Sequence, residues 1–239
     1  MEITKLFVEK SENPTDAKCP CVVFLGDSVT QGCFELYKKT PETIETVFDQ
    51  NSTYHGYLKK IMAMLYPNVP MNFINSGISG NTSRAGLKRL ERDVLKYEPD
   101  LTVVCFGLND CIVLPLDEYC DNLRTIFTRI KEQGGEVIFM TPNMMNTNVS
   151  PHILKDDNII TWAEERAGWQ LRGDLTKFVE AGKKVAEECG VKICDVYAKW
   201  MKMYENGVNT TELLANHINH PTREMNWLFA YSLAETIMS

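Results

Sequence analysis

Short apolar runs alternate along the chain with longer segments in which apolar residues recur every three or four positions. Such short runs are typical of buried strands, and the wider spacing is typical of one face of a helix. The runs that predict strands are Cys21–Leu25, Met71–Ile74, Leu101–Phe106, Val137–Met140 and Val191–Cys194. Because segments with helical period lie between them, we expect the strands to pair in parallel, with helices on both faces of the sheet.

Three of the intervening segments have a clear helical period. Their apolar positions are Tyr57, Leu58, Ile61, Met62 and Leu65 in the first segment, Leu87, Leu90 and Val94 in the second, and Tyr119, Cys120, Leu123, Ile126, Phe127 and Ile130 in the third. Pro67 is expected to stop the first helix, Asp117 to be the N-cap of the third, and Gly134-Gly135 to end it. With five strands, the alternation favours a flavodoxin-like α/β fold. Its three α/β/α layers would enclose a five-stranded parallel sheet of order 2-1-3-4-5.

The connection after the fourth predicted strand is unusually long. No stretch rich in Pro, Gly or Ser divides the chain, so we expect a single domain over residues 1–239. Residues 143–173 exceed an ordinary strand-to-helix connection and predict an insertion. This insertion carries Met144, Met145, His152, Trp162 and Trp169. Two interpretations stand equally: it covers the functional site, or it is a helical insertion whose tryptophans belong to the core.

Charge and composition exclude several classes of partner. With 25 basic and 32 acidic residues, the chain carries a formal net charge of −7. It has no basic stripe, so we expect no nucleic-acid partner. No apolar run is long enough to span a bilayer, and the first residues lack the apolar core of a signal peptide, which together favour a cytoplasmic protein. The eight cysteines lack zinc-ligand spacing and are expected to be reduced thiols. No metal or other cofactor is predicted, and the oligomeric state is left open, a homo-oligomer included.

Clusters of polar residues follow three of the predicted strands, and a fourth cluster precedes the last amphipathic segment. Parallel strands bring their carboxyl ends to one edge of the sheet, which is where ligands bind in open α/β folds. The four clusters would therefore meet there. They are Gly26-Asp27-Ser28, Asn75 to Thr82, Gly107 to Asp110, and Asn216 to Pro221.

These clusters contain the parts of a serine acyl-transfer site. Ser28 offers a hydroxyl that needs a base, and the His220 imidazole is the usual base near neutral pH. A tight-loop N–H at Gly80 and the side-chain amide of Asn109 could stabilise an oxyanion. Each residue alone has an ordinary structural explanation: a helix cap for Ser28, a turn for Gly80 or Asn109, a loop position for His220. Together they favour catalysis, with Asp27 as a hydrogen-bond acceptor that fixes the loop.

The four clusters resemble the sequence blocks of the SGNH subgroup of the GDSL esterase/lipase superfamily. Three blocks match in order, and the fourth matches in its His-Pro pair, so the resemblance spans Gly26 to Pro221. It implies a flavodoxin-like sheet and a nucleophile at Ser28. It also implies His220 as the base and an oxyanion hole formed by the Ser28 N–H, the Gly80 N–H and the Asn109 side chain.

The fourth block departs from the family at one position. Three residues before His220, where the family has Asp, this chain has His217. The missing carboxylate would hold the base in one tautomer and stabilise the imidazolium. A backbone carbonyl near Asn216 or His217 could accept the Nδ1 proton instead and give a Ser–His dyad, which is the reading we favour. In the alternatives, an acid from Asp156-Asp157 reaches in, or the site is slow or inactive. Asp27, Asn216 and His217 are thus candidate supporting residues.

The resemblance implies a serine esterase that forms an acyl-enzyme on Ser28. With no long apolar lid segment, the sequence favours short acyl groups, above all O-acetyl groups on carbohydrates, so the expected partner is a small-molecule or oligosaccharide ester. The alternatives are a lysophospholipase or acyl thioesterase, and a degenerate hydrolase that binds an acylated ligand without turnover.

Overall fold

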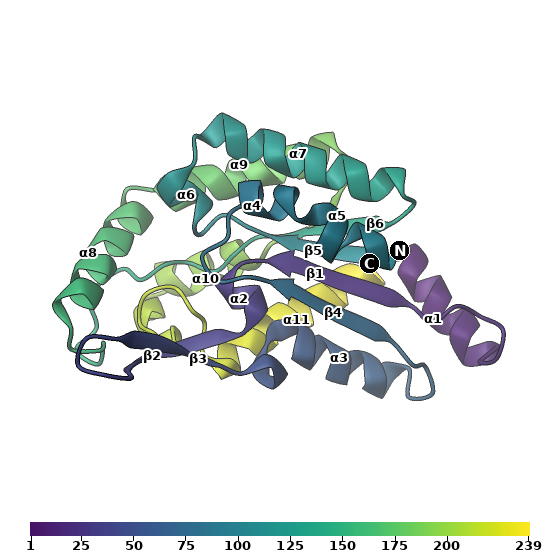
Figure 1. The fold of residues 1–239 in the computed structure, drawn as a ribbon, viewed down its shortest axis with the longest axis horizontal. Helices are drawn as coiled ribbons and strands as arrows, with labels where there is room; N and C mark the ends of the chain where they lie inside the picture. The colour runs from purple at the N-terminus through teal and green to yellow at the C-terminus, as the bar shows by residue number, and fades with distance from the viewer.

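A five-stranded parallel sheet forms the centre of the protein. The computed structural model describes residues 1–239, and every strand pair in this sheet is parallel (Figure 1). In spatial order the strands are β4 (Asn72–Gly77), β1 (Cys21–Gly26), β5 (Leu101–Cys105), β6 (Glu136–Met140) and β7 (Lys192–Cys194). Numbered along the chain, this is the order 2-1-3-4-5. The predicted flavodoxin-like sheet is therefore confirmed.

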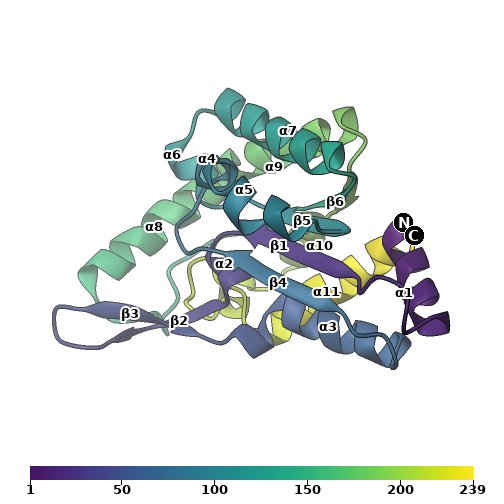
Figure 2. The same cartoon turned by 45° about the vertical axis from the view of Figure 1, so that its right-hand side comes forward.

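Helices cover both faces of the sheet and complete three layers (Figures 1 and 2). One layer contains α3 (Tyr54–Leu65) and α11 (Arg223–Met238), which lie below the sheet in Figure 1, and shares its core with α1 (Glu2–Glu12) and α10 (Val196–Glu205). The layer above contains α4 (Ser83–Lys88), α5 (Leu90–Asp93), α6 (Asp110–Val113), α7 (Leu116–Glu132) and α9 (Asp174–Glu188). The short elements are α2 (Ser28–Gln31) and the 3-10 turns η1 (Gln50–Ser52), η2 (Leu95–Tyr97) and η3 (Thr210–Leu213).

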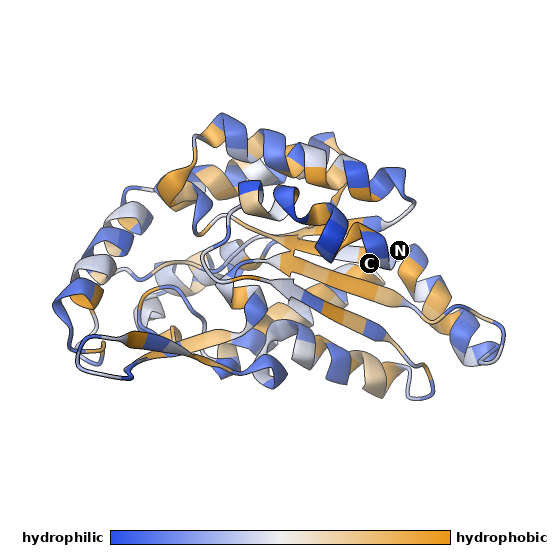
Figure 3. Ribbon diagram, in the orientation of Figure 1, coloured by the Kyte–Doolittle hydropathy of each residue, from blue (hydrophilic) through white to orange (hydrophobic).

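Strand β1 is buried along its whole length, which explains why its sequence is a continuous apolar run. Its side chains alternate between the two cores: Val22 and Phe24 pack toward α3 and α11, and Val23 and Leu25 toward α7. The apolar colour of the central strands is visible in Figure 3. Burying each of these side chains contributes roughly 1.5–3 kcal/mol. The strand that leads to Ser28 is thus held by packing on both of its faces.

A small antiparallel hairpin and a helix lie beyond the carboxyl ends of the central strands, at the left of Figure 1. The hairpin pairs β2 (Cys33–Lys38) with β3 (Ile44–Phe48), and the helix is α8 (Asp157–Leu171). A separate apolar cluster of Ile153, Ile159, Ala163 and Ile218 joins them, with Leu36 and Ile44 of the hairpin packed against it. The sequence pattern did not predict the hairpin, because both strands are half-exposed and lack a continuous apolar run.

The second half of the segment 143–173 is helical. The Trp162 side chain is 49% exposed and is not a core residue, whereas Trp169 packs against the core below the sheet. The segment before the helix is extended, and Met144 and Met145 are buried in the core below the sheet.

Two of the predicted helices differ in detail. The segment with Leu90 in its apolar face is not one helix but α4, α5 and η2, broken at Arg89. Helix α7 has Pro115 as its N-cap, so the prediction of Asp117 was wrong; Asp117 lies in the first turn, where its charge complements the helix dipole. The predicted stop after α7 is confirmed, since Gly134 adopts a left-handed φ of +85°.

None of the eight cysteines forms a disulfide. No helix combines the length and the apolar character that crossing a membrane requires.

Candidate active site

Ser28 is the first residue of α2, directly beyond the end of β1. Asp27 is the N-cap of this helix, and its Oδ1 accepts the Val29 N–H at 3.0 Å. The turn requires glycine at Gly26, because a Cβ there would collide with the Thr30 side chain. As the first helical residue, Ser28 has a backbone N–H with no acceptor inside the helix. The serine hydroxyl and a free N–H are therefore held side by side.

His220 contacts the Ser28 hydroxyl from the other end of the chain. The distance from His220 Nε2 to Ser28 Oγ is 3.1 Å, and both side chains are buried. The second ring nitrogen, Nδ1, lies 3.0 Å from the backbone carbonyl oxygen of Phe34 on β2. A carbonyl only accepts hydrogen bonds, so Nδ1 carries the proton. Nε2 is left with a free lone pair that points at the serine, which is the tautomer a general base needs.

No carboxylate bonds to the His220 ring. The acceptor on Nδ1 is a backbone carbonyl, as in the favoured prediction, but it comes from Phe34 and not from the neighbourhood of Asn216 or His217. The alternative acid, Asp156, is occupied elsewhere: it caps α8 and pairs with Lys38 at 3.1 Å. The arrangement is a Ser–His pair completed by main chain.

Asn216 and His217 shape the loop that carries the base. The Asn216 Oδ1 accepts the backbone N–H groups of Ile218 at 3.0 Å, Asn219 at 2.9 Å and His220 at 2.9 Å. His217 has a left-handed φ of +57°, and its Nδ1 lies 3.6 Å from Glu212 with no hydrogen bond to His220. Asn216 thus fixes the loop, while His217 does not contact the base.

Burial dominates the electrostatics of this pair. Desolvation lowers the pKa of His220 to about 4, with the Phe34 carbonyl opposing the shift. Desolvation also raises the pKa of Asp27 to about 7, against the hydrogen bond from Val29. His220 is therefore neutral at pH 7 and able to accept a proton.

The loop after β4 brings Gly80 toward Ser28. Ile78 donates its N–H to the Gly26 carbonyl at 3.2 Å, and Ser79 donates its N–H to the Gln31 side chain at 2.6 Å, so the loop is tied to both sides of the serine. Gly80 has a left-handed φ of +75°, and its N–H has no acceptor within the protein. This is the second free backbone donor in the region.

Asn109 connects the loops after β4 and β5. Its Nδ2 donates to the Asn81 carbonyl at 3.0 Å and lies 3.4 Å from Asp27 Oδ2. The neighbouring Asp110 accepts the N–H groups of Ser83 at 2.7 Å and Gly107 at 3.0 Å. These contacts fix the Asn109 amide next to the residue that precedes the nucleophile.

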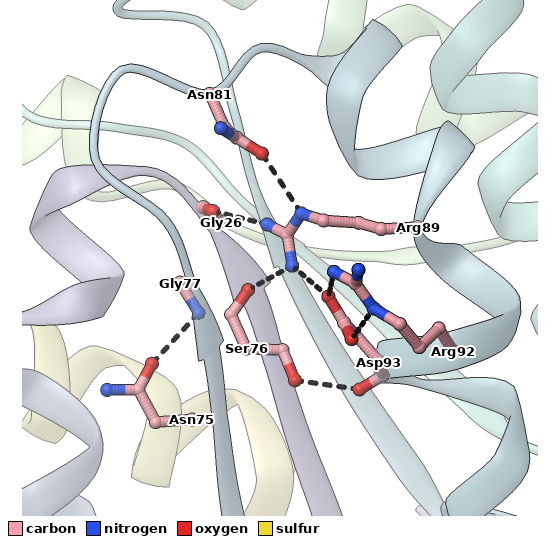
Figure 4. Close-up of polar contacts among 8 residues, drawn as sticks. All are labelled: Gly26, Asn75, Ser76, Gly77, Asn81, Arg89, Arg92 and Asp93. Carbon is pink, nitrogen blue, oxygen red and sulfur yellow. Dashed lines mark hydrogen bonds and ion pairs between the residues drawn. The ribbon is translucent and has the colours of Figure 1, made fainter.

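Arg89 supports three of these segments from behind (Figure 4). Its guanidinium donates to the carbonyls of Gly26 at 2.9 Å and Ser76 at 2.7 Å, and to the Asn81 side chain at 3.0 Å. It also pairs with Asp93 at 3.2 Å. Arg89 is only 7% exposed. Sequence reasoning missed it, because nothing in the sequence distinguishes Arg89 from the neighbouring Arg84 and Arg92.

Two further contributors were also missed. Phe34 supplies a main-chain atom, and nothing in its side chain marks that role. Arg223 contacts the hairpin from the residue after the Thr222 helix cap. No group of three or more His, Cys, Asp or Glu side chains is arranged to hold a metal ion.

Comparison with known proteins adds to this geometry. The model of the GDSL-like Lipase/Acylhydrolase family matches residues 24–228. An acetylxylan esterase of Geobacillus stearothermophilus is 30% identical over 138 residues, which cover 53% of this chain and 61% of that protein. An arylesterase of Vibrio mimicus is 33% identical over 79 residues, covering 33% of this chain and 40% of the relative. The matched regions thus span less than two thirds of either relative.

Solved structures share the fold. An acetylxylan esterase of Geobacillus stearothermophilus superposes with a TM-score of 0.69 at 23% identity, covering 91% of this chain and 94% of the other. A lipase/acylhydrolase of Enterococcus faecalis has a TM-score of 0.68 at 23% identity, with coverage of 91% and 95%. At this identity the likeness extends to the fold alone.

Proposed function

The chain belongs to the GDSL-like lipase/acylhydrolase family, and on that premise we propose that it is a carboxylic ester hydrolase with Ser28 as its nucleophile. The observation that carries the proposal is the hydrogen-bonded series from the Ser28 hydroxyl through the His220 ring to the Phe34 carbonyl. A serine with a neutral, correctly oriented imidazole beside free backbone donors is the arrangement that acyl transfer requires.

In the proposed mechanism, the Ser28 Oγ attacks the ester carbonyl carbon while His220 Nε2 takes its proton. The tetrahedral oxyanion accepts hydrogen bonds from the Ser28 N–H and the Gly80 N–H. The Asn109 side-chain amide becomes the third donor by exchanging its long 3.4 Å contact with Asp27 for the oxyanion. His220 then protonates the leaving alcohol, and the acyl group remains on Ser28. Water, deprotonated by His220, attacks the acyl-enzyme, releases the carboxylic acid and restores the serine.

We propose short acyl groups on carbohydrates, most of all O-acetyl groups, as the substrate class. The support is the 30% identity to an acetylxylan esterase. A groove between the β2–β3 hairpin and α8, with a volume of about 450 Å³, adds room for an extended alcohol portion. Its lining is half apolar, from Leu36, Ile44, Ile159 and Trp162, and half polar, from Glu42, Glu45, Thr46 and Asn158. An aromatic ring beside hydrogen-bonding side chains suits the faces and the hydroxyls of sugar rings.

The test is a rate comparison across p-nitrophenyl esters from acetyl to long acyl chains, together with acetylated xylo-oligosaccharides. We expect hydrolysis that is fastest for acetyl groups and falls by on the order of 10⁴ or more in kcat in Ser28→Ala. Covalent labelling of Ser28 by a fluorophosphonate would report the activated hydroxyl independently.

Full activity in Ser28→Ala would contradict the proposed nucleophile. Preference for long acyl chains or thioesters would favour the lysophospholipase or thioesterase alternative. Ligand binding without labelling or turnover would favour a binding module.

A further inference from the structure

The carbonyl that accepts from His220 lies in an irregular part of the hairpin. Cys33 pairs with Phe48 and Leu36 with Thr46, so two residues of β2 stand opposite one residue of β3. The extra residue makes a β-bulge at Phe34 and Glu35. Bulges remove a residue from the ladder and turn its groups in a new direction. Here the bulge leaves the Phe34 carbonyl free to point at the His220 ring.

A two-stranded hairpin has little stability of its own, so the position of this carbonyl depends on what the hairpin contacts. On one side the hairpin rests on the small cluster that includes Ile159 and Ile218. It is also tied to α8 by the ion pair of Lys38 with Asp156, and it contacts Arg223 at the start of α11. Arg223 follows His220 by three residues, so the base and this cation belong to one rigid segment.

Arg223 contacts the bulge in β2 and the residue that follows β3. Its guanidinium pairs with Glu35 at 2.5 Å and with Asp49, just after β3, at 3.1 Å. The same group lies over the Phe34 ring, 4.3 Å from the ring centroid. Phe34 is buried, and the Arg223 side chain is 32% exposed. A planar guanidinium can make these three contacts at once, whereas an ammonium cannot.

We propose that Arg223 is a positioning residue that holds the Phe34 carbonyl on His220 Nδ1, the task that a carboxylate performs directly in a Ser-His-Asp triad. The proposal rests on the proposed function of Ser28 and His220. An isolated surface ion pair would contribute little. Arg223 differs because its three contacts surround the bulge whose carbonyl orients the base.

Removing the guanidinium should therefore lower the rate of the chemical step and leave the affinity for the substrate nearly unchanged. In Arg223→Met we expect kcat to fall about 10²-fold, the size of effect that a 1 Å misplacement produces. KM should stay within about threefold, because Arg223 does not line the groove proposed for the alcohol portion of the substrate. Arg223→Lys and Glu35→Gln each keep part of the clamp and should fall between Arg223→Met and the unchanged protein.

A spectroscopic readout separates positioning from general stability. The ¹⁵N shifts of the His220 ring at pH 7, assigned by their loss in His220→Gln, report which nitrogen carries the proton. We expect the proton on Nδ1 alone in the unchanged protein and a mixture of tautomers in Arg223→Met. The matched control is Arg124→Met, which also removes an arginine between two carboxylates, Asp121 and Glu188, on the outer helices. It should alter neither kcat nor the tautomer.

Unchanged kcat together with a pure Nδ1 tautomer in Arg223→Met would overturn the proposal. If Arg223→Met does not fold, equal kcat and tautomer in Arg223→Lys, Glu35→Gln and the unchanged protein would overturn it. Failure of the proposed function gives a different result: the unchanged protein would hydrolyse no ester and Ser28 would not be labelled. The tautomer measurement would still decide whether Arg223 positions the carbonyl.

Discussion

At the scale of single residues, the base has a neutral partner where the family has a carboxylate. A carbonyl can fix the tautomer of His220, but it lacks the charge that would stabilise the imidazolium. Burial therefore dominates, and the pKa of His220 falls to about 4. The proton of the Ser28 hydroxyl therefore moves to an imidazole that is a weaker base than usual. His220 also stays unprotonated in mildly acidic solution, at pH values above its pKa of about 4.

The first prediction concerns the acid limb of the pH profile. His220 can accept a proton only when neutral, so activity is present above its pKa and is lost as the pH falls through it. We expect kcat/KM on p-nitrophenyl acetate to hold from neutral pH to about pH 5 and to fall with an apparent pKa near 4. Initial rates between pH 3.5 and about 8, with folding checked by circular dichroism, would measure it. A limb near pH 6.5 would contradict this prediction.

The sequence predicted side chains at the site better than it predicted main-chain atoms. Ser28 and His220 could be found because their side chains supply the reactive groups, so that the residue type alone indicates them. Both also lie in polar clusters that the sequence predicted to meet at the carboxyl edge of the sheet. The Phe34 carbonyl could not be found, since every residue has one and only the folded bulge selects it. Arg89 and Arg223 look like surface arginines until their partners, far away in the chain, are known.

At the scale of elements, the break between α4 and α5 makes room for a buried cation. Arg89 occupies the break and serves the carbonyl ends of β1 and β4 at the same time, through Gly26 and Ser76. Its burial lowers its pKa, and the Asp93 carboxylate opposes the shift. The two strand ends that carry Ser28 and lead to Gly80 are therefore fixed to one another.

The second prediction is that Arg89→Met destabilises the protein and weakens catalysis. Losing the guanidinium removes its hydrogen bonds to the buried Gly26 and Ser76 carbonyls, although Gly26 still accepts the Ile78 N–H. We expect this loss to cost about 2–4 kcal/mol of the free energy of unfolding. Urea denaturation and kcat would be measured together. The control is Arg92→Met, because Arg92 is exposed and pairs only with Asp93; it should cost less than about 1 kcal/mol. If Arg89→Met and Arg92→Met have the same free energy of unfolding, the hydrogen bonds of Arg89 do not stabilise the protein more than a surface ion pair does.

Elements were predictable where both faces are buried. Strands such as Leu101–Cys105 read as apolar runs because helices cover both sides of the sheet. The β2–β3 hairpin was missed because its burial fades from Cys33 to Lys38, which leaves neither alternation nor a run. The N-cap of α7 was misplaced because Asp117 and Pro115 are both suitable at a helix start, and only the backbone distinguishes them.

At the scale of the whole molecule, the β2–β3 hairpin and α8 lie beyond the carboxyl edge of the sheet. The alternation of strands and helices did not predict this extension. The hairpin and α8 lie next to each other (Figure 2) and line a common groove. The small apolar cluster between them includes Ile218 of the loop that carries His220. The walls of this groove are thus connected to the loop that holds His220.

The third prediction concerns this groove. Trp162 lines it, and one face of its ring lies under Arg166 at 5.6 Å. If sugar rings bind along the groove, Trp162→Ala should raise KM for acetylated xylo-oligosaccharides about three- to tenfold, the usual range for an aromatic contact. The rate on p-nitrophenyl acetate should not change. Tyr97→Ala, an exposed aromatic that precedes β5 at the opposite edge of the sheet, is the control. If Trp162→Ala and the unchanged protein have the same KM for acetylated xylo-oligosaccharides, the sugar rings do not bind against Trp162.

The Phe34 carbonyl has a consequence for genetics. In a Ser–His–Asp site each of the three groups is a side chain, so a substitution can remove any one of them. Here the third group is a backbone carbonyl, which every amino-acid substitution retains. A saturation library would detect Ser28 and His220 through their lost functional groups, whereas every replacement of Phe34 retains the acceptor and acts only by removing a buried ring from the bulge. Only an altered backbone, such as an ester in place of the amide between Phe34 and Glu35, would weaken that oxygen directly. An amino-acid substitution can affect this acceptor only indirectly, by changing the residues that shape the bulge.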